Sequence, residues 1–202
     1  MRAAQFLTLV LTTFSIASAC AGEFNQTLNI GDAAPMFEKL PGVDGQEHSL
    51  ADFKDKPYVL VVFTCNGCPC AVDYEDRLID FAKRHAEKLA VVAINVNAVP
   101  ADNLEKMKER QAEKKFPYPY IQDASQKIAK DYGAEGTPEV FLLSPERKVI
   151  YMGAIDDADD ASQVKHNYLE DAFTAALAGK EPETKETFAS GCRIRWERKR
   201  RK

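Results

Sequence analysis

The sequence contains little histidine and tryptophan, with three histidines and one tryptophan among 202 residues. His48, His85 and His166 are far apart in the chain, which argues against a hydrolase that needs an imidazole base beside its nucleophile. The same scatter argues against a histidine-rich metal site. Internal repeats and low-complexity tracts are missing as well, so the chain fits one globular domain with short extensions.

Long apolar runs are also missing, apart from a short one at residues 3–17 that ends in Ala17-Ser18-Ala19. These small residues after an apolar run predict a signal peptide over 1–19, and hence export to the periplasm or cell envelope. The run is too short and too interrupted by Thr and Ser for a comfortable membrane span, although an N-terminal anchor stays an alternative. Cys20 follows the cleavage point directly, so lipid attachment through its thiol is a second alternative.

The net charge of −4 is distributed unevenly. From Arg193 onward, seven basic residues and one acid give a local net charge of +6, which leaves −10 for the remainder. An acidic body with a basic end does not resemble a nucleic-acid-binding protein. We expect that end to be solvated, with contact to anionic lipid as the alternative. The acidic run 156–160 lacks the Gly and distal Glu of an EF-hand, so a solvated loop is expected there.

Five cysteines are present, and two of them form the motif Cys65-Asn66-Gly67-Cys68. The motif follows the uncharged run 58–64, which predicts a buried strand, and precedes an expected helix. A helix N-terminus carries positive potential and free N–H groups, which favour a thiolate. A disulfide across two intervening residues constrains little chain, so it adds little stability. The pair therefore predicts thiol–disulfide redox chemistry rather than a structural link.

The remaining periodicities predict an α/β domain over residues 31–180, with a linker at 20–30 and a tail at 181–202. Buried strands alternate with amphipathic helices, and a hairpin and a closing helix follow. The expected architecture is a three-layer fold in which helices flank a mixed central sheet. Its strands are expected at 58–64, 89–96, 140–143 and 148–151, and its helices at 49–52, 74–88, 102–115, 125–132 and 168–177.

Four segments are informative together: Gly31 to Phe37, Phe63 to Pro69, Gly136-Thr137-Pro138, and Gly191 to Trp196. As a set they resemble the thioredoxin superfamily, in the branch of the alkyl hydroperoxide reductase and thiol-specific antioxidant (peroxiredoxin-like) proteins. The resemblance implies a thioredoxin-like fold, with Cys65 as the nucleophile and Cys68 as its resolving partner. It also implies that Thr137 and Pro138 form a cis-proline turn against the disulfide. Thr64 is expected to support the site from the position before the first cysteine.

Two departures from that family bear on the mechanism. Residues 58–64 carry no acid, so a proton acceptor has to be water or a residue from elsewhere in the chain. The peroxiredoxin signature Pro-x-x-x-Thr-x-x-Cys is missing, although Cys68-Pro69 matches the Cys-Pro of those proteins. We expect an exported thiol–disulfide oxidoreductase that acts on protein disulfides or dithiols, with a thiol peroxidase as the alternative. A membrane-bound or periplasmic thiol donor is a further expected partner.

Cys70 and Cys192 have three open arrangements. They could be bonded to each other as a clamp between tail and core, or act as a second relay that passes the disulfide outward from Cys65 and Cys68. In the third arrangement both remain unpaired thiols. Together with Cys65 and Cys68 they also allow a thiolate site for zinc or copper, the basis of a metal-carrier alternative. The spacing is not that of two separated Cys-x-x-Cys pairs, so we expect no metal and no cofactor. Haem attachment is excluded, because Pro69 stands where that motif needs His.

Overall fold

The computed structural model describes residues 22–197. The predicted signal peptide, Cys20 and the basic residues from 198 onward lie outside this range. A five-stranded mixed sheet forms the centre, in the order β5-β4-β3-β7-β8. Its strands are β3 (Tyr58–Thr64), β4 (Leu89–Asn95), β5 (Tyr120–Gln122), β7 (Glu139–Leu143) and β8 (Val149–Gly153).

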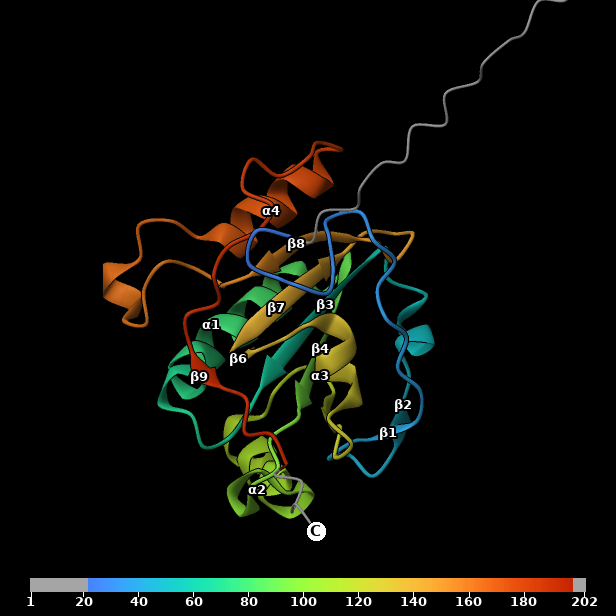
Figure 1. Cartoon of the computed structure of the whole chain (residues 1–202), viewed down its shortest axis with the longest axis vertical. Coiled ribbons are helices and arrows are strands. Elements are labelled where there is room, and N and C mark those ends of the chain that lie inside the picture. The colour runs from blue at the N-terminus through green and yellow to red at the C-terminus, as the bar shows by residue number, and fades with distance from the viewer. Residues whose placement is uncertain (1–21, 198–202) are drawn as a thin grey trace, which may run out of the picture.

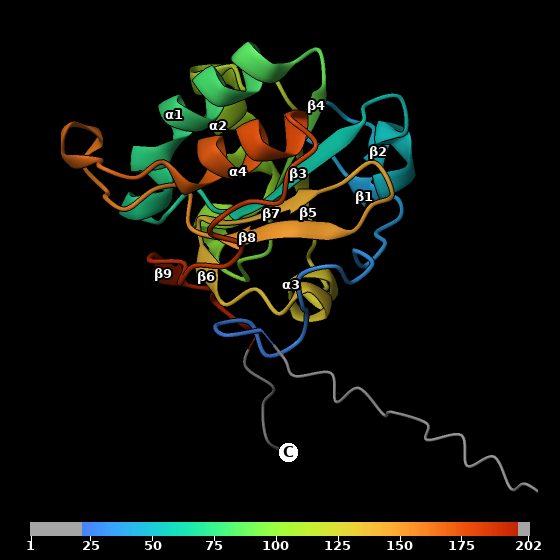
Figure 2. The ribbon, with the colours of Figure 1, turned by 90° about the horizontal axis from the view of Figure 1, so that it is seen from above.

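Helices cover both faces of this sheet (Figure 1). Figure 2 shows α1, α2 and α4 on one side and α3 on the other. Alternate residues of a strand point to opposite faces, so β3 contributes Leu60 to the core under α1 and Val61 to the core over α3. The predicted three-layer α/β fold is confirmed. The helices are α1 (Pro69–His85), α2 (Leu104–Lys114), α3 (Lys127–Tyr132) and α4 (Tyr168–Leu177).

Strand directions bring three strand ends to one edge of the sheet. β4 runs parallel to β3, so both strands end at this edge, at Asn95 and Thr64. β7 runs antiparallel to β3, so it begins at the same edge, with Glu139 opposite Phe63. Parallel strands need a crossover connection, which α1 supplies between β3 and β4. Side chains from distant parts of the sequence therefore gather where α1 begins.

The structure also has short elements. The 3-10 turn η1 (Leu50–Phe53) forms where a brief helix was expected at 49–52, whereas strands of two or three residues carry no period from which to predict them. Among them, β6 pairs antiparallel with β9, so the C-terminal segment lies beside the turn before β7. The short elements other than β5 are β1 (Leu40–Pro41), β2 (Glu47–His48), β6 (Gly136–Thr137), β9 (Cys192–Arg193) and the 3-10 turns η1 (Leu50–Phe53), η2 (Pro100–Asp102) and η3 (Ala161–Gln163).

The N-terminal segment packs on the domain and contacts the C-terminal segment. The Glu186 carboxylate accepts hydrogen bonds from three consecutive N–H groups, those of residues 23–25. The side chain of Asn25 donates to the carbonyl oxygen of Tyr132, which ends α3, at 2.8 Å. Residues expected to act as a linker are thereby tied to the region expected to form a tail.

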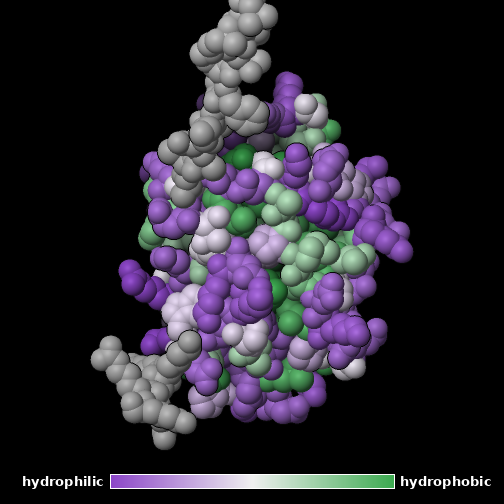
Figure 3. Space-filling model, turned by 45° about the vertical axis from the view of Figure 1, so that its right-hand side comes forward, coloured by the Kyte–Doolittle hydropathy of each residue, from purple (hydrophilic) through white to green (hydrophobic). Residues whose placement is uncertain are grey.

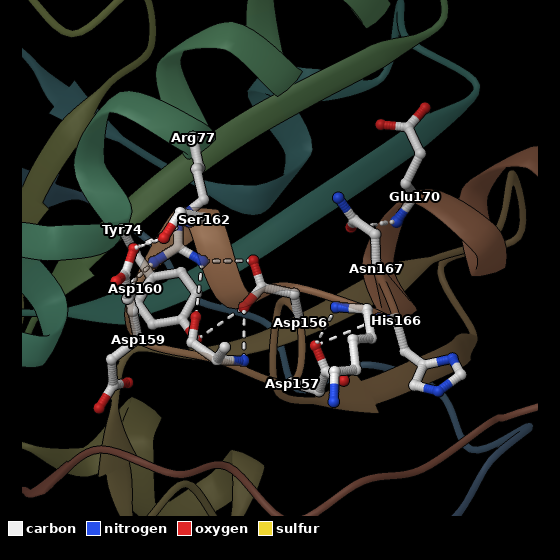
Figure 4. A network of polar contacts seen from close by, with 12 residues as sticks. Tyr74, Arg77, Asp156, Asp157, Asp159, Asp160, Ser162, His166, Asn167 and Glu170 are labelled. Atoms are coloured by element: carbon white, nitrogen blue, oxygen red, sulfur yellow. Dashed lines mark hydrogen bonds and ion pairs between the residues drawn. The ribbon is translucent and has the colours of Figure 1, made fainter.

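The acidic run between β8 and α4 is partly anchored to the domain (Figure 4), while Asp157, Asp159 and Asp160 are exposed, as expected of a solvated loop. Asp156 is buried, and its carboxylate accepts from the Tyr74 hydroxyl at 2.9 Å and from Arg77 at 2.5 Å. Asp157 accepts from the backbone N–H groups of Lys165 and His166. The expectation of a solvated loop is therefore wrong for Asp156, because α1 supplies a cation and a hydroxyl that satisfy its charge.

The surface agrees with the charged composition. Hydrophilic side chains dominate the face seen in Figure 3, with smaller apolar areas between them. Within residues 22–197, none of the helices combines the length and the apolarity that crossing a membrane requires.

Candidate redox site

A disulfide joins Cys68 to Cys192, which are 124 residues apart in the sequence and have Cα atoms 6.0 Å apart. Cys65 and Cys70 are free thiols. The sequence allowed a clamp between Cys70 and Cys192, but Cys192 bonds to Cys68 instead. A disulfide does link the tail to the core, and it uses the sulfur that was expected to resolve Cys65.

Strand β3 and helix α1 position the first two sulfurs. Thr64 ends β3 opposite Asn95 of β4, and Cys65 follows directly. Cys68 is the N-cap of α1, and Pro69 is its first residue. Proline suits that position, because the first N–H groups of a helix have no partner within it. Cys68, rather than Cys65, therefore lies at the positive end of α1.

Thr137 contacts all three cysteines that meet at this turn. Its peptide bond to Pro138 is cis, as the resemblance implies. Its hydroxyl donates to the carbonyl oxygen of Cys192 at 3.3 Å and lies 3.3 Å from Sγ of Cys65. The hydroxyl has one proton, so it donates to only one of these two atoms at a time, and either partner can be the donor in the contact with Cys65. Sγ of Cys68 lies 3.4 Å from the Thr137 carbonyl oxygen, and this contact becomes a hydrogen bond only when Cys68 is reduced.

The C-terminal segment crosses the site as an added strand. Pairing of β9 with β6 places Cys192 opposite Thr137, and the two strands lie side by side in both Figure 1 and Figure 2. The N–H of Arg195 then donates to the side-chain oxygen of Asn97 at 2.7 Å. Ile194 is buried in the core on the α3 side of the sheet. Backbone pairing and apolar burial thus hold the tail in addition to the disulfide.

Burial controls the Cys65 thiol. Only 3% of Cys65 is exposed, and this burial raises the pKa of its thiol above the usual value. The negative charge of Asp102 raises the pKa further, and the hydrogen bond with Thr137 opposes both effects. The expectation that the start of the helix favours the thiolate is therefore wrong for Cys65 in this oxidised form, because desolvation outweighs it.

A buried acid, Asp102, lies behind the motif and was not predicted as a site residue. It belongs to η2, and its carboxylate accepts from the N–H of Asn66 at 2.6 Å. The side chains of Asn95 and Asn97 donate to the same carboxylate, at 3.2 and 3.0 Å. Residues 58–64 lack an acid, and the structure supplies one from beyond β4. The available signal for a polar site here was the set of polar residues Asn95, Asn97 and Asp102, which lie at the end of a buried strand and shortly after it.

A second buried acid, Glu139, supports the cis-proline turn. Its carboxylate accepts from the N–H groups of Glu135 and Gly136, at 2.9 and 3.0 Å. Burial raises the pKa of Glu139 to about 7, although both hydrogen bonds lower it. Since Gly136 belongs to β6, this carboxylate holds the strand on which β9 pairs. The sequence contains no clear signal for this role, because Glu139 is the first residue of β7 and a charged residue at the end of a strand is usually exposed to solvent.

Cys70 lies in the first turn of α1 and is partly exposed. The Sγ atoms of Cys68, Cys70 and Cys192 all lie within 4.8 Å of one another. In the oxidised form, however, two of the three sulfurs are bonded to each other and offer no thiolate to a metal ion. In this form, the cluster consists of the free thiol of Cys70 beside the Cys68–Cys192 disulfide.

The mixed sheet, the Cys-x-x-Cys motif at the end of its central strand and the cis-proline turn beside the sulfurs define a redox protein of the thioredoxin-like class. Residues 30–152, more than half of the chain, match the model of the AhpC/TSA family. The chain belongs to the AhpC/TSA family.

Solved structures are similar to this chain over most of its length. A hypothetical protein of Sinorhizobium meliloti is 38% identical with a TM-score of 0.79, and the match covers 86% of this chain and 97% of that one. An uncharacterized protein of Geobacillus kaustophilus is 30% identical with a TM-score of 0.79, covering 86% and 95%. The thioredoxin domain of a thiol-disulfide oxidoreductase from Bacteroides vulgatus is 25% identical with a TM-score of 0.52, covering 60% and 86%. No curated protein matches the chain.

Proposed function

We propose that the protein is an exported thiol–disulfide oxidoreductase that exchanges disulfides with protein partners of the periplasm or cell envelope. The observation that carries this proposal is the convergence of two sulfurs on one residue. Thr137 lies 3.3 Å from Sγ of Cys65 and 3.4 Å from Sγ of Cys68. A free thiol therefore lies on the same turn as a sulfur that already takes part in a disulfide.

In the reductive direction, the Cys65 thiolate attacks one sulfur of a partner disulfide and releases the other partner sulfur as a thiolate. The Cys68 thiolate then attacks Sγ of Cys65, forms the Cys65–Cys68 disulfide and releases the second partner thiolate. Two electrons pass to the partner, and the two released thiolates take up the protons that Cys65 and Cys68 lost. Cys68 suits the second step, because the N-terminus of α1 stabilises its thiolate.

Cys192 extends this sequence by one exchange. Its thiolate attacks Sγ of Cys68, forms the Cys68–Cys192 disulfide and returns Cys65 to a thiol, with no net change in electrons. The product of this step is the arrangement present in the structure. An external thiol donor then reduces Cys68–Cys192 and completes the cycle.

A thiol peroxidase is the second candidate, and the burial of Cys65 favours it. A thiol with 3% exposure beneath a paired strand is more accessible to a small hydroperoxide than to a protein disulfide. In that reaction the Cys65 thiolate takes the terminal hydroxyl of the peroxide, and the alkoxide that leaves takes up the proton lost by Cys65 and becomes an alcohol. The Cys68 thiol then condenses with the sulfenic acid and releases water.

Replacing Cys65 by Ser tests the first candidate. Dithiothreitol-driven insulin reduction is expected to fall to the uncatalysed rate, because the attacking sulfur is gone. Thermal unfolding of the same variant controls for folding, and full retention of insulin reduction would refute the role of Cys65. Hydroperoxide consumption with the same donor separates the candidates: sustained turnover supports the peroxidase, and slow oxidation of one equivalent supports disulfide exchange.

A further inference from the structure

Cys70 has no part in the reaction proposed above, yet its thiol is free and lies beside the disulfide. Its Sγ lies within 4.8 Å of both Cys68 and Cys192. It is partly exposed, whereas Cys65 and Cys68 are buried. A sulfur–sulfur bond is about 2.05 Å long, so side-chain movement of less than about 3 Å would bring Cys70 into bonding distance of the disulfide.

We propose that Cys70 is a third redox thiol that moves the tail disulfide from Cys68 to itself. The Cys70 thiolate attacks Sγ of Cys192, the Cys70–Cys192 bond forms, and the Cys68–Cys192 bond breaks. Cys68 leaves as a thiolate with the bonding electron pair, and the proton of Cys70 passes to solvent or to Cys68. The exchange is neutral in electrons and needs no other reactant. Its consequence for turnover depends on the proposed function of Cys65 and Cys68.

Two features direct the attack to Cys192 rather than to Cys68. Cys192 is partly exposed, as Cys70 is, whereas 3% of Cys68 is exposed. Attack on Cys192 also expels the better leaving group, because the Cys68 thiolate lies at the N-cap of α1. A Cys68–Cys70 disulfide would instead span one residue at the start of a helix, where side chains two positions apart do not face each other.

The exchange frees Cys68 while the tail stays attached. β9 remains linked to α1 through Cys70–Cys192, and Cys68 becomes available to resolve Cys65. The fully oxidised protein then holds two disulfides, Cys65–Cys68 and Cys70–Cys192, and the reduced protein holds two pairs of electrons. Without Cys70, the same site holds one pair.

The Cys65→Ser variant isolates the exchange from catalysis. We would oxidise the reduced variant with one equivalent of diamide, quench it in acid, label free thiols with N-ethylmaleimide, and locate the label by fragmentation between Cys68 and Pro69. Label on Cys70 reports the Cys68–Cys192 disulfide, and label on Cys68 reports the Cys70–Cys192 disulfide. Both are expected, with roughly a tenth or more of the total label on Cys68, because a tenfold ratio corresponds to a free-energy difference of only about 1.4 kcal/mol between the two disulfides. Label on Cys70 alone at every time point would overturn the proposal.

Two further readings make the test specific. At pH values below neutrality, the rate at which the two labelled forms reach equilibrium should rise about tenfold for each unit by which the pH is raised, because only the thiolate attacks. Excess oxidised glutathione should leave the wild type with one more intramolecular disulfide per molecule than Cys70→Ser, counted by intact mass so that bound glutathione is distinguished. Equal numbers of intramolecular disulfides would contradict the inference. If Cys65→Ser loses insulin reduction and the label lies on Cys70 alone, the role of Cys65 stands and only the role proposed for Cys70 is refuted. Retained insulin reduction with label on both refutes only the role proposed for Cys65.

Discussion

At the scale of single residues, the state of the Cys65 thiol depends on opposing neighbours. Burial and the charge of Asp102 raise its pKa, and the hydroxyl of Thr137 lowers it. The thiol is therefore protonated in the oxidised form, and its reactivity depends on what covers it. Cys192 packs against the cluster that contains Cys65, so the tail contributes to this burial.

Replacing Asp102 by Asn should lower the pKa of Cys65, because the negative charge that raises it is removed. Iodoacetamide should then alkylate Cys65 faster at a fixed pH near neutrality. The measurement uses Cys70→Ser with the tail disulfide intact, so that Cys65 is the free thiol among residues 22–197. Asp80→Asn, which removes an exposed acid of α1, is the control, and an unchanged or slower rate in Asp102→Asn would contradict the prediction.

Glu139 should make stability depend on pH. Its pKa rises from 4.5 to about 7 on folding, so the folded state binds more protons between these values than the unfolded state. The free energy of unfolding should therefore fall as pH rises through this window, by up to about 3 kcal/mol. Glu139→Gln keeps an oxygen that accepts from the same N–H groups and should remove this fall.

Urea unfolding at several pH values in that window measures the effect. Glu135→Gln, at an exposed acid four residues away, serves as the control and should keep most of the pH dependence. An equally steep fall of stability in Glu139→Gln and in the wild type would show that Glu139 does not titrate as proposed.

At the scale of elements, the pairing of β6 with β9 decides whether Cys192 reaches the site. Gly191 precedes β9, and a Cβ atom there would lie 2.4 Å from the carbonyl oxygen of Thr137. Such a distance is too short for an unshifted backbone, so any side chain at this position must displace one of the two strands. The close approach thus explains why glycine suits this position.

Gly191→Ala should weaken the Cys68–Cys192 disulfide, because a displaced β9 lowers the effective concentration of one sulfur near the other. The equilibrium constant for its formation in glutathione buffers is expected to fall about tenfold, equivalent to about 1.4 kcal/mol. The neighbouring exposed residue provides the control Ser190→Ala, which should leave the constant unchanged. A constant equal to that of the wild type in Gly191→Ala would show that β9 tolerates the added methyl group.

The longer elements were predictable because each carries its own period. Strand β3 was expected at 58–64 and forms there, and helix α4 was expected at 168–177 and forms there. The helix expected at 74–88 begins earlier, at Pro69, because its first turn holds the cysteines and lacks an apolar repeat. β6 and β9 have two residues each and form only because the chain returns to the same place.

At the scale of the whole molecule, the tail disulfide closes a loop of 124 residues. A bond across so long a loop restricts the unfolded chain far more than a Cys65–Cys68 bond would. Reducing it should therefore lower the free energy of unfolding by about 2–4 kcal/mol, the usual range for a native disulfide. Urea unfolding with and without dithiothreitol measures this difference.

Cys192→Ser provides the comparison for that measurement. Its stability should be insensitive to dithiothreitol and close to that of the reduced wild type, because neither contains the long loop closure. A reduced wild type as stable as the oxidised protein would instead mean that β9 and the buried Ile194 hold the tail without help from the disulfide.

The sequence by itself determined the layered α/β architecture and the redox motif at the end of β3, since local hydrophobic periods and a two-residue cysteine spacing are readable from neighbours in the chain. The family resemblance added the cis-proline turn at Thr137 and Pro138. Only the tertiary structure decided which sulfur meets Cys192, which acid lies behind Cys65, and how deeply that thiol is buried. These depend on residues from β6, η2 and β9 that come together across long separations, and no local pattern encodes such contacts.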